Sequence, residues 1–351
     1  MSQWRDKIRK VEPYTPGEQP KDKNIIKLNT NENPYGPSPR LLQIQQNMEE
    51  LRLYPDPTAG VLVDGIAAYH QVNADQVFVG VGSDDVLAMA FMTFFNSELP
   101  IFFPDITYSF YDVWAELFRI PYERQEVDSE FRIRREDYYK ENGGVIFPNP
   151  NAPTGIYENL EFVEDILQHN PDVIVIVDEA YIDFGGTSAL PLLEKYENLL
   201  IVRTFSKSRS LAGLRIGYAI GSPELIKAMN DVKYSFNSYT MNRSALQLGS
   251  EVLKDEAYFQ ETVQKVITTR TWFEEEMKKL GFSFPDSKAN FIFATREGVS
   301  AEALSEAAKS RGIYVRHFKQ PRINQYLRIT IGTDEQMKVF LEFLKDYLKQ
   351  I

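Results

Sequence analysis

Short apolar runs alternate with longer amphipathic stretches through the first two thirds of the chain. The runs predict strands, because they are brief, apolar and bounded by polar residues; they lie at 76–80, 100–103, 145–147, 199–205 and 217–221. Residues 172–180, DVIVIVDEA, have the β-branched composition of a strand buried on both faces. The stretches at 84–95, 106–118 and 160–168 predict helices. This alternation favours an α/β fold with βαβ units, a mainly parallel sheet and helices on both sides of it.

The pattern changes near residue 240. A long helical region is expected at 242–280, followed by a strand (290–294), a helix (299–310), a strand (326–332) and a helix (334–348). We therefore expect a large domain of residues 41–240 and a smaller α+β domain of residues 241–351, a division that suits the length of the chain. Residues 1–40 are rich in Pro, Asn and Gly, which predicts an extended N-terminal arm that partly joins the smaller domain.

The composition, with 43% hydrophobic and 25% charged residues, is typical of a soluble globular protein. No apolar run approaches the roughly 18 residues of a membrane span, and the polar start of the chain indicates no secretory signal. The chain has no cysteine, and its three histidines are not at metal-ligand spacing, so neither a disulfide nor a metal is expected. The net charge of −11 argues against binding to nucleic acid or to anionic membranes.

Polar groups follow several of the predicted strands at their carboxyl ends. Gly82, Ser83 and Asp84 open a helix directly after a strand, which makes either an anion site or only a helix cap. Asp178 ends the buried strand and requires a cationic partner there, unless it caps a helix or loop. Lys207 follows the next strand and is either a Schiff-base lysine or a solvated one.

Arginines and a rigid loop add further candidates. Arg215 lies among apolar neighbours eight positions after the lysine, and a bidentate arginine suits a phosphate. Arg316 and Arg328, at strand-like positions of the smaller domain, either converge on a phosphate or carboxylate or are solvated strand charges. NPNAPTG at 149–155 predicts a rigid loop beyond another strand end. A dinucleotide site is rejected, because Asp85 replaces the third glycine of the GxGxxG pattern.

The carboxyl ends of parallel strands meet at one edge of a sheet, so the anion turn, the carboxylate and the lysine with its following arginine are expected to converge. Together these groups match the needs of a single cofactor. Pyridoxal phosphate (PLP) has a phosphate, a pyridine nitrogen, a phenolic oxygen and an aldehyde.

The motifs of the chain also resemble those of a known family. In order along the chain they are LNTNENPYGPSP, YPDP, VGVGSDDVL, NPNAPTG, VDEAYIDF, RTFSKSRSLAGLRIGY and LRITIG. This set resembles the fold-type I, class-II PLP-dependent aminotransferases over nearly the whole chain and, more narrowly, looks like the histidinol-phosphate aminotransferases. The resemblance implies a large domain with a mainly parallel sheet of the seven-stranded type between helices, a smaller α+β domain, PLP as cofactor, and a homodimer in the cytoplasm.

The resemblance also implies roles for individual residues. Lys207 would form the imine with PLP and then shuttle protons, Asp178 would pair with the pyridine nitrogen, and Tyr181 would hydrogen-bond the phenolic oxygen. Tyr108 would stack on the ring, and Tyr54 would reach the phosphate in the neighbouring subunit. The phosphate cradle would consist of Gly82, Ser83, Asp84, Thr204, Ser206 and Arg215. The substrate side would consist of Tyr14, Asn290, Arg316 and Arg328, whose two arginines match those that hold a substrate phosphate or the acid group of a dicarboxylate.

One position departs from the family. The family usually has Asn immediately before Pro-Thr-Gly, in contact with the phenolic oxygen, whereas this chain has Ala152. Either Asn151 or Asn149 takes over that contact, or Tyr181 acts alone; we expect Asn151 to bind the cofactor. Losing one hydrogen bond to a charged oxygen costs roughly 1.5–3 kcal/mol, which would alter the pKa of the imine rather than abolish cofactor binding.

The expected reaction moves an amino group between L-histidinol phosphate and 2-oxoglutarate by a ping-pong route in histidine biosynthesis, so the expected partners are small molecules. Two alternatives use the same cofactor site, namely an aromatic amino acid aminotransferase and a threonine-phosphate decarboxylase. They differ in what the distal arginines hold. A PLP-binding regulator without turnover is more distant, because such proteins usually add a DNA-binding segment, for which this acidic chain has no residues left.

Overall fold

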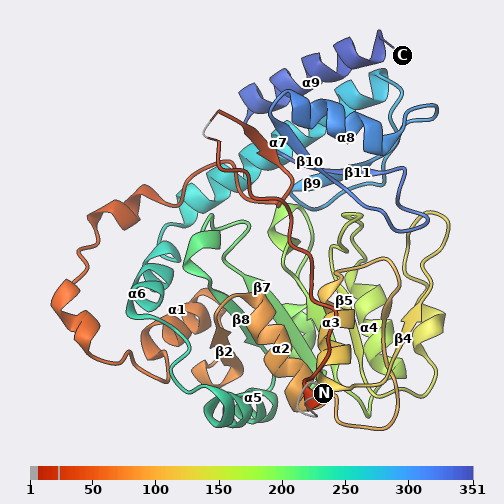
Figure 1. The fold of residues 1–351 in the computed structure, drawn as a ribbon. Helices are drawn as coiled ribbons and strands as arrows, with labels where there is room; N and C mark the ends of the chain where they lie inside the picture. Colours follow the sequence, from red (N-terminus) through yellow and green to blue (C-terminus); the bar gives the residue numbers. More distant parts are fainter. Residues whose placement is uncertain (1–6, 23, 351) are drawn as a thin grey trace.

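The computed structural model describes residues 7–22 and 24–350. The fold of these residues is built around two sheets (Figure 1). The larger sheet has seven strands in the order β2-β8-β7-β6-β5-β3-β4. Its strands are β2 (Val77–Gly80), β3 (Ile101–Pro104), β4 (Tyr122–Gln125), β5 (Val145–Pro148), β6 (Val175–Asp178), β7 (Leu199–Thr204) and β8 (Gly217–Ile220). Neighbouring strands from β4 to β7 pair in parallel, and β8 lies antiparallel between β7 and β2. The predicted mainly parallel α/β sheet is confirmed.

Helices cover both faces of this sheet. They are α1 (Gly60–His70), α2 (Ser83–Phe94), α3 (Phe110–Phe118), α4 (Leu160–His169), α5 (Pro223–Phe236) and α6 (Arg243–Val252). Ile146 and Ile176 pack in one apolar cluster with α2, α3 and α5, whereas Phe147 and Val175, one position away, pack in another with α4. Burial on both faces explains why most positions of the central strands are apolar.

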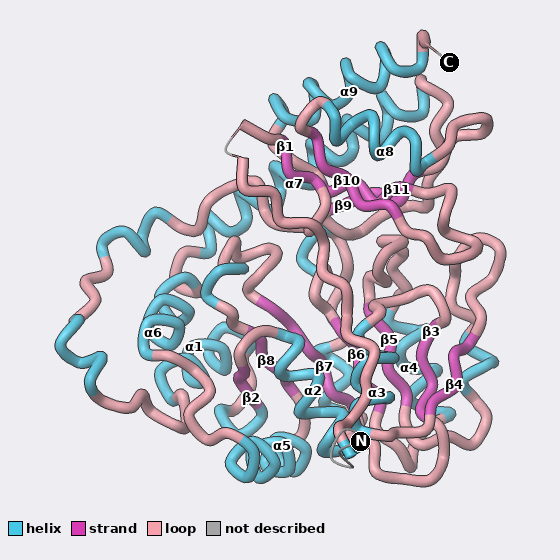
Figure 2. Tube along the Cα trace, in the orientation of Figure 1, coloured by secondary structure: helices cyan, strands magenta, loops and turns pink. Residues whose placement is uncertain are grey.

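The smaller sheet has the strand order β1-β10-β11-β9. Its strands are β1 (Ile26–Leu28), β9 (Phe291–Ala294), β10 (Ile313–His317) and β11 (Leu327–Thr330), and its helices are α7 (Glu256–Lys279), α8 (Ala301–Ser310) and α9 (Asp334–Leu348). Strand β1 comes from the N-terminal segment and pairs in parallel with β10, so residues from both ends of the chain share this sheet. Before β1, the chain runs as a long loop along the larger part of the molecule (Figure 2). There the ring of Tyr14 stacks on that of Phe110 in α3, with centroids 4.2 Å apart.

Several elements differ from the sequence-based expectation, and helices α1 and α5 and strand β1 were not predicted. Strand β4 was not predicted, because its sequence, YERQ, is polar and lies at the edge of the sheet. The single helical region expected at 242–280 is two helices, α6 and α7, with Asp255 as the N-cap of the second. The strands and helices expected in the rest of the C-terminal part are confirmed.

The packing is continuous across the domain boundary expected near residue 240. Helix α6 contributes Ala245 and Leu246 to a cluster with Leu62 and Ile66 of α1, on the side of the larger sheet. Helix α7 instead packs in the apolar cluster of the smaller sheet. The division at residue 240 therefore stays a prediction. Residues 1–6 and 23 of the expected arm, and residue 351, lie outside the described residues.

Candidate active site

A cavity of about 360 Å³ lies where β5, β6 and β7 end. Pro148, Asp178 and Thr204, the last residues of these strands, all line it, and the N-terminal arm, the first turn of α2 and strands β10 and β11 complete its wall. The cavity is within the range of about 300–1,000 Å³ that is usual for small-molecule sites. It brings together most of the residues singled out from the sequence, namely Tyr14, Ser83, Asp84, Tyr108, Asp178, Tyr181, Thr204, Ser206, Lys207, Arg215, Arg316 and Arg328.

Other predicted residues do not line this cavity. Gly82 is the N-cap of α2, just behind the wall. Asn290 is fully buried and donates a hydrogen bond of 3.0 Å to the carbonyl oxygen of Asn31. Tyr54 is 79% exposed and packs on Tyr239, with ring centroids 4.7 Å apart. Within the described chain, Tyr54 is thus a surface residue away from the cavity.

Asn151 does not line the cavity either, because its side chain is used inside the loop that follows β5. Its amide nitrogen donates to the carbonyl oxygen of Ile106 (2.9 Å), and its amide oxygen accepts from Thr107 (2.9 Å). Asn149 is engaged in the same way, since both of its amide atoms bond to the backbone of Glu158 at 2.8 Å. In this arrangement neither asparagine directs its amide into the space beside Ala152.

Asp178 is a buried carboxylate at the bottom of the cavity. It accepts hydrogen bonds of 3.1 Å from the hydroxyl of Tyr111 and from the backbone N–H of Ala180. Burial raises the pKa of Asp178 to about 7, and these two hydrogen bonds oppose the rise. A cation next to this carboxylate would remove the penalty. Tyr111 was not found by sequence reasoning, since one tyrosine in an amphipathic helix carries no functional signal.

Lys207 lies on the loop after β7, in direct contact with the N-terminal arm. Its Nζ donates to the carbonyl oxygen of Thr30, 3.1 Å away, and lies 5.7 Å from the centre of the Tyr181 ring. The backbone around it is held by Asn33, whose amide donates to the carbonyl oxygens of Lys207 (3.1 Å) and Ser208 (3.3 Å). Asn33 therefore holds the backbone at Lys207, and the side chain of Lys207 faces the cavity.

The turn between β2 and α2 combines backbone donors with Arg215. Gly82 has a φ of 89°, and a side chain there would clash with the Arg215 guanidinium. A side chain on Gly217 would clash with the backbone of Gly82 and Ser83, so both glycines allow a close approach that other residues would block. Arg215 contacts Ser206 (3.3 Å) and Asp84 (3.6 Å). A helix N-terminus beside an arginine favours an anion.

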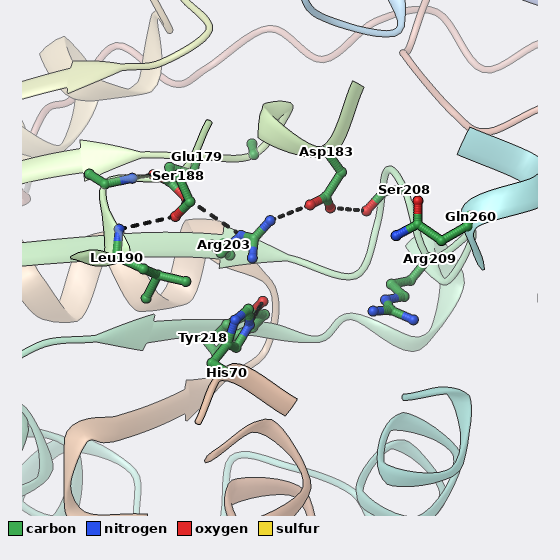
Figure 3. A network of polar contacts seen from close by, with 12 residues as sticks. His70, Glu179, Asp183, Ser188, Leu190, Arg203, Ser208, Arg209, Tyr218 and Gln260 are labelled. Atoms are coloured by element: carbon green, nitrogen blue, oxygen red, sulfur yellow. Dashed lines mark hydrogen bonds and ion pairs between the residues drawn. The ribbon is translucent and has the colours of Figure 1, made fainter. Parts of the chain in front are cut away.

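A buried ionic network joins the strand of the carboxylate to the loop of the lysine (Figure 3). Arg203 in β7 lies between Asp183, to which it donates, and Glu179, 3.6 Å away. Asp183 also accepts from the hydroxyl of Ser208, directly after Lys207. Burial raises the pKa of Glu179, and the positive charge of Arg203 opposes this rise. The network thus fixes the segment after Asp178 relative to the loop that carries Lys207.

Arg316 and Arg328 are direct partners in the antiparallel pair of β10 and β11. Both lie beside Phe318, with guanidinium-to-ring distances of 5.6 and 5.7 Å. Burial lowers the pKa of Arg328, and the charge of Arg316 lowers it further. Like charges directly opposite one another destabilise a sheet, so this pair is well placed to bind an anion between its two guanidinium groups.

A larger, more open groove of about 1190 Å³ adjoins the cavity and shares Tyr14 and Arg316 with it. The arm residues 10–15 form one wall of this groove. We regard the smaller cavity as the chemical site, because it holds Lys207 and Asp178, and the groove as its entrance. In residues 7–22 and 24–350, no helix is both long and apolar enough to cross a bilayer. The same residues form no cluster of three or more side chains suited to a metal ion.

The sequence model of the family described as aminotransferase class I and II matches residues 23–344. The chain therefore belongs to this family of aminotransferases. Within it, the chain is similar to a protein from Lactococcus lactis subsp. cremoris named histidinol-phosphate aminotransferase, with 52% identity over 351 residues, which cover 99% of this chain and 98% of the relative. A protein of the same name from Clostridium beijerinckii is 49% identical over 344 residues, 97% of this chain and 96% of the relative.

Solved structures agree with this placement. The histidinol-phosphate aminotransferase from Clostridium acetobutylicum superposes with a TM-score of 0.86 at 25% identity, covering 93% of this chain and all of the other (100%). The enzyme of that name from Sinorhizobium meliloti, solved in complex with pyridoxal-5'-phosphate, has a TM-score of 0.83 at 23% identity, with 92% and 91% of the two chains covered. The second likeness bears on the fold alone.

Proposed function

We propose that this chain moves an amino group between L-histidinol phosphate and 2-oxoglutarate with PLP as its cofactor, in the cytoplasm. The observation that carries the proposal is one cavity that is lined by a lysine amine, a buried carboxylate and a cross-strand pair of arginines. Relatives about half identical over nearly the whole chain bear the name of this activity, which supports the choice of substrate.

The residues of the cavity fit PLP. Asp178, with its raised pKa, would meet the protonated pyridine nitrogen, and Lys207 would hold the cofactor covalently. Tyr181 would donate to the phenolic oxygen, and Tyr108 would lie against the ring. The turn at Gly82, Ser83 and Asp84, with Thr204, Ser206 and Arg215, would bind the phosphate, because the glycines there leave the backbone open to a close approach.

Bound PLP supplies an electron sink for the bond that breaks at the substrate Cα. The protein would do the rest. Lys207, once displaced by the substrate amine, would take the proton from the substrate Cα and deliver it to the neighbouring carbon of the bound cofactor. Asp178 would keep the pyridine nitrogen protonated, and the arm with Tyr14 would limit access of water from the adjoining groove.

Arg316 and Arg328 would select the substrate. A phosphate placed between the two guanidinium groups would offset their mutual repulsion, and so would the distal carboxylate of 2-oxoglutarate in the second half-reaction. Phenylalanine has neither a phosphate nor a distal carboxylate, because its side chain ends in an uncharged ring. We therefore expect a strong preference for substrates with a distal anion.

We extend the proposal to a homodimer. Exposed apolar side chains gather before α1 and at or just after the end of α5, and Tyr54 is among them; they are Leu42, Met48, Leu51, Leu53, Tyr54, Phe236 and Tyr239. A second copy that covers this surface would bury these side chains and bring Tyr54 towards the phosphate site of its partner.

Asn290 and Asn151 would have supporting roles within one chain. Asn290 supports the arm through Asn31, and Asn151 supports the loop that follows β5.

The cofactor is tested by absorption spectroscopy. Purified protein mixed with PLP should show the visible band of a lysine-bound cofactor, and Lys207→Ala should lose it while the exposed control Lys254→Ala keeps it. A band that survives Lys207→Ala would overturn the assignment of the lysine.

The substrate is tested with steady-state rates for histidinol phosphate, histidinol, phenylalanine and threonine phosphate. We expect histidinol phosphate to have by far the highest kcat/KM. Equal rates with phenylalanine, or release of CO₂ from threonine phosphate, would replace the proposed substrate by that of a related enzyme.

Shared sites are tested by mixing two weak variants, Lys207→Ala and Tyr54→Ala. If Tyr54 completes the partner's site, mixed dimers contain one intact site and activity returns. If activity does not return in a mixture shown to exchange subunits, Tyr54 does not complete the site of the partner subunit.

A further inference from the structure

Residues 29–33 of the N-terminal segment form a strap that contacts functional groups from both sheets. The carbonyl oxygen of Asn29 accepts from Arg328 (3.0 Å), and that of Thr30 accepts from Lys207 (3.1 Å). Asn31, between these contacts and Asn33, is 1% exposed and has a φ of 56°. Its side chain joins the larger part of the protein to the smaller sheet.

Asn31 makes four hydrogen bonds to three other residues. Its amide nitrogen donates to the phenol oxygen of Tyr181, 2.9 Å away. Its backbone N–H donates to the hydroxyl of Thr330 (3.0 Å), and this hydroxyl donates back to the Asn31 amide oxygen (2.9 Å). Its carbonyl oxygen accepts from Asn290 (3.0 Å). A buried side chain with this many partners has a fixed position.

Thr330 also fixes which end of the Asn31 amide meets Tyr181. The oxygen of Thr330 already accepts from the Asn31 backbone, so its proton is free to be donated to the Asn31 amide oxygen. A flipped amide would leave the proton of this buried hydroxyl without its acceptor. The amide nitrogen therefore faces Tyr181, and the phenol oxygen of Tyr181 acts as the acceptor.

Because Tyr181 accepts from Asn31, its own proton has to be donated elsewhere. Among residues 7–22 and 24–350, no hydrogen bond donated by this phenol is found. Tyr181 lines the cavity next to Ala152, the position where the family usually has a second donor to the phenolic oxygen of the cofactor. Tyr181 is then the donor on which this contact depends.

We propose that Asn31 is a positioning residue that directs the Tyr181 hydroxyl proton into the cavity, towards the phenolic oxygen of the cofactor. The inference rests on the proposed binding of PLP by Lys207. A donor to that oxygen stabilises the deprotonated form of the lysine-bound cofactor, in which the oxygen carries an uncompensated negative charge. Asn31 thus acts, through Tyr181, to lower the pKa of the lysine-bound cofactor.

Two substitutions keep the left-handed backbone of Asn31 and change only its side chain. Asn31→Gly removes the donor without strain at a positive φ. Asn31→Asp replaces the donor by an acceptor, which turns the Tyr181 proton away from the cavity. The pKa of the lysine-bound cofactor, read from its absorption bands between pH 5 and 10, should rise by about 0.5 unit in the first and by about one unit or more in the second. Asn24→Asp, an exposed position of the same segment, is the matched control and should leave the pKa unchanged.

A double-mutant cycle tests whether Asn31 acts through Tyr181. Tyr181→Phe alone should raise the same pKa, and adding Asn31→Gly to it should produce no further change. Substitutions of Thr330, which fixes the orientation of the Asn31 amide, test the direction of the Tyr181 proton a second time. Thr330→Val, which frees the amide to flip, should raise the pKa, whereas Thr330→Ser, which keeps the hydroxyl, should restore the wild-type value.

The outcomes separate the inference from the function on which it rests. If wild-type protein gives no lysine-bound cofactor, the proposed function fails. If it does, but Asn31→Asp, Asn31→Gly and Thr330→Val change only the thermal stability and leave the pKa where it was, Asn31 is structural and the inference is wrong. An equal rise with Asn31→Gly in the Tyr181→Phe background would show that Asn31 acts on the cofactor by another path.

Discussion

The phenol of Tyr111 donates a hydrogen bond of 3.1 Å to the carboxylate of Asp178 at the floor of the cavity. Burial raises the pKa of Tyr111 well above its usual value, so the phenol keeps its proton and acts only as a donor. The carboxylate itself is uncompensated by any cation in direct contact within the described residues. Burying this charge without a cation costs free energy, and the proposed pyridinium would remove that cost at the same position.

The first prediction concerns Asp178→Asn in protein without cofactor. The folded protein holds a proton on Asp178 up to a pKa of about 7, whereas the usual value is 3.8, so the stability contributed by this proton is lost as the pH rises through that window. The asparagine variant should therefore unfold at a higher temperature than wild type at pH 8, by an amount that corresponds to about 1–3 kcal/mol, and should match wild type near pH 4. Thermal unfolding across this pH range measures it, with exposed Asp172→Asn as control.

The same variant should bind PLP more weakly. Replacing the carboxylate removes the charge partner of the pyridine nitrogen, which should cost about 1.5–3 kcal/mol, or roughly 10- to 100-fold in the dissociation constant. Fluorescence titration with PLP measures this change. A gain in stability without cofactor, combined with a loss in affinity, is a pattern that a merely disruptive substitution does not produce.

The second prediction concerns the substrate anion. Arg328→Gln should lower kcat/KM for histidinol phosphate by about 10- to 100-fold, since it removes charge-assisted hydrogen bonds worth about 1.5–3 kcal/mol. The effect on histidinol, which lacks the phosphate, should be much smaller, and Arg311→Gln, at an exposed position of the same part of the chain, should change neither rate. Equal losses for both substrates would show that Arg328 supports the site without binding the phosphate.

The third prediction concerns the buried network of Arg203. Arg203→Met should lower the free energy of unfolding by about 3–5 kcal/mol, because it leaves Glu179 and Asp183 without their cation. Lys227→Met breaks an exposed ion pair with Asp231 and should cost less than about 0.5 kcal/mol. Urea denaturation of the three proteins measures both values, and a comparable small cost for both variants would contradict the role given to Arg203.

Several parts of the site could be predicted because they follow strands. Asp178 and Lys207 were identified because a polar residue after an apolar run falls at the carboxyl edge of a parallel sheet, and the structure places both at the cavity. The fold followed from the same alternation. What these residues do with a cofactor remains a prediction that the experiments above address.

The contacts that the sequence did not predict join positions far apart in the chain. Asn31 meets Tyr181 over a separation of 150 positions and Thr330 over 299, and no local pattern signals such a pairing. Arg203 stood inside an apparently apolar strand, and its partners on the segment after β6 became visible only in the folded chain. Periodicity reports which face of an element is buried, but not which buried polar groups meet there.

The last prediction concerns His70, whose Nε2 lies 2.8 Å from the hydroxyl of Tyr218. Burial, together with the nearby positive charge of Arg203, lowers the pKa of His70 to about 3. Unfolding therefore binds a proton between pH 6.5 and about 3, so the protein should lose stability as the pH falls through this window, by about 1–2 kcal/mol at pH 5 for this one group. His70→Gln keeps an acceptor for Tyr218 but does not titrate, so the difference in urea midpoint between pH 7.5 and pH 5 should be smaller in this variant than in wild type. An identical pH response of the His70→Gln variant and wild type would mean that His70 does not contribute to acid unfolding.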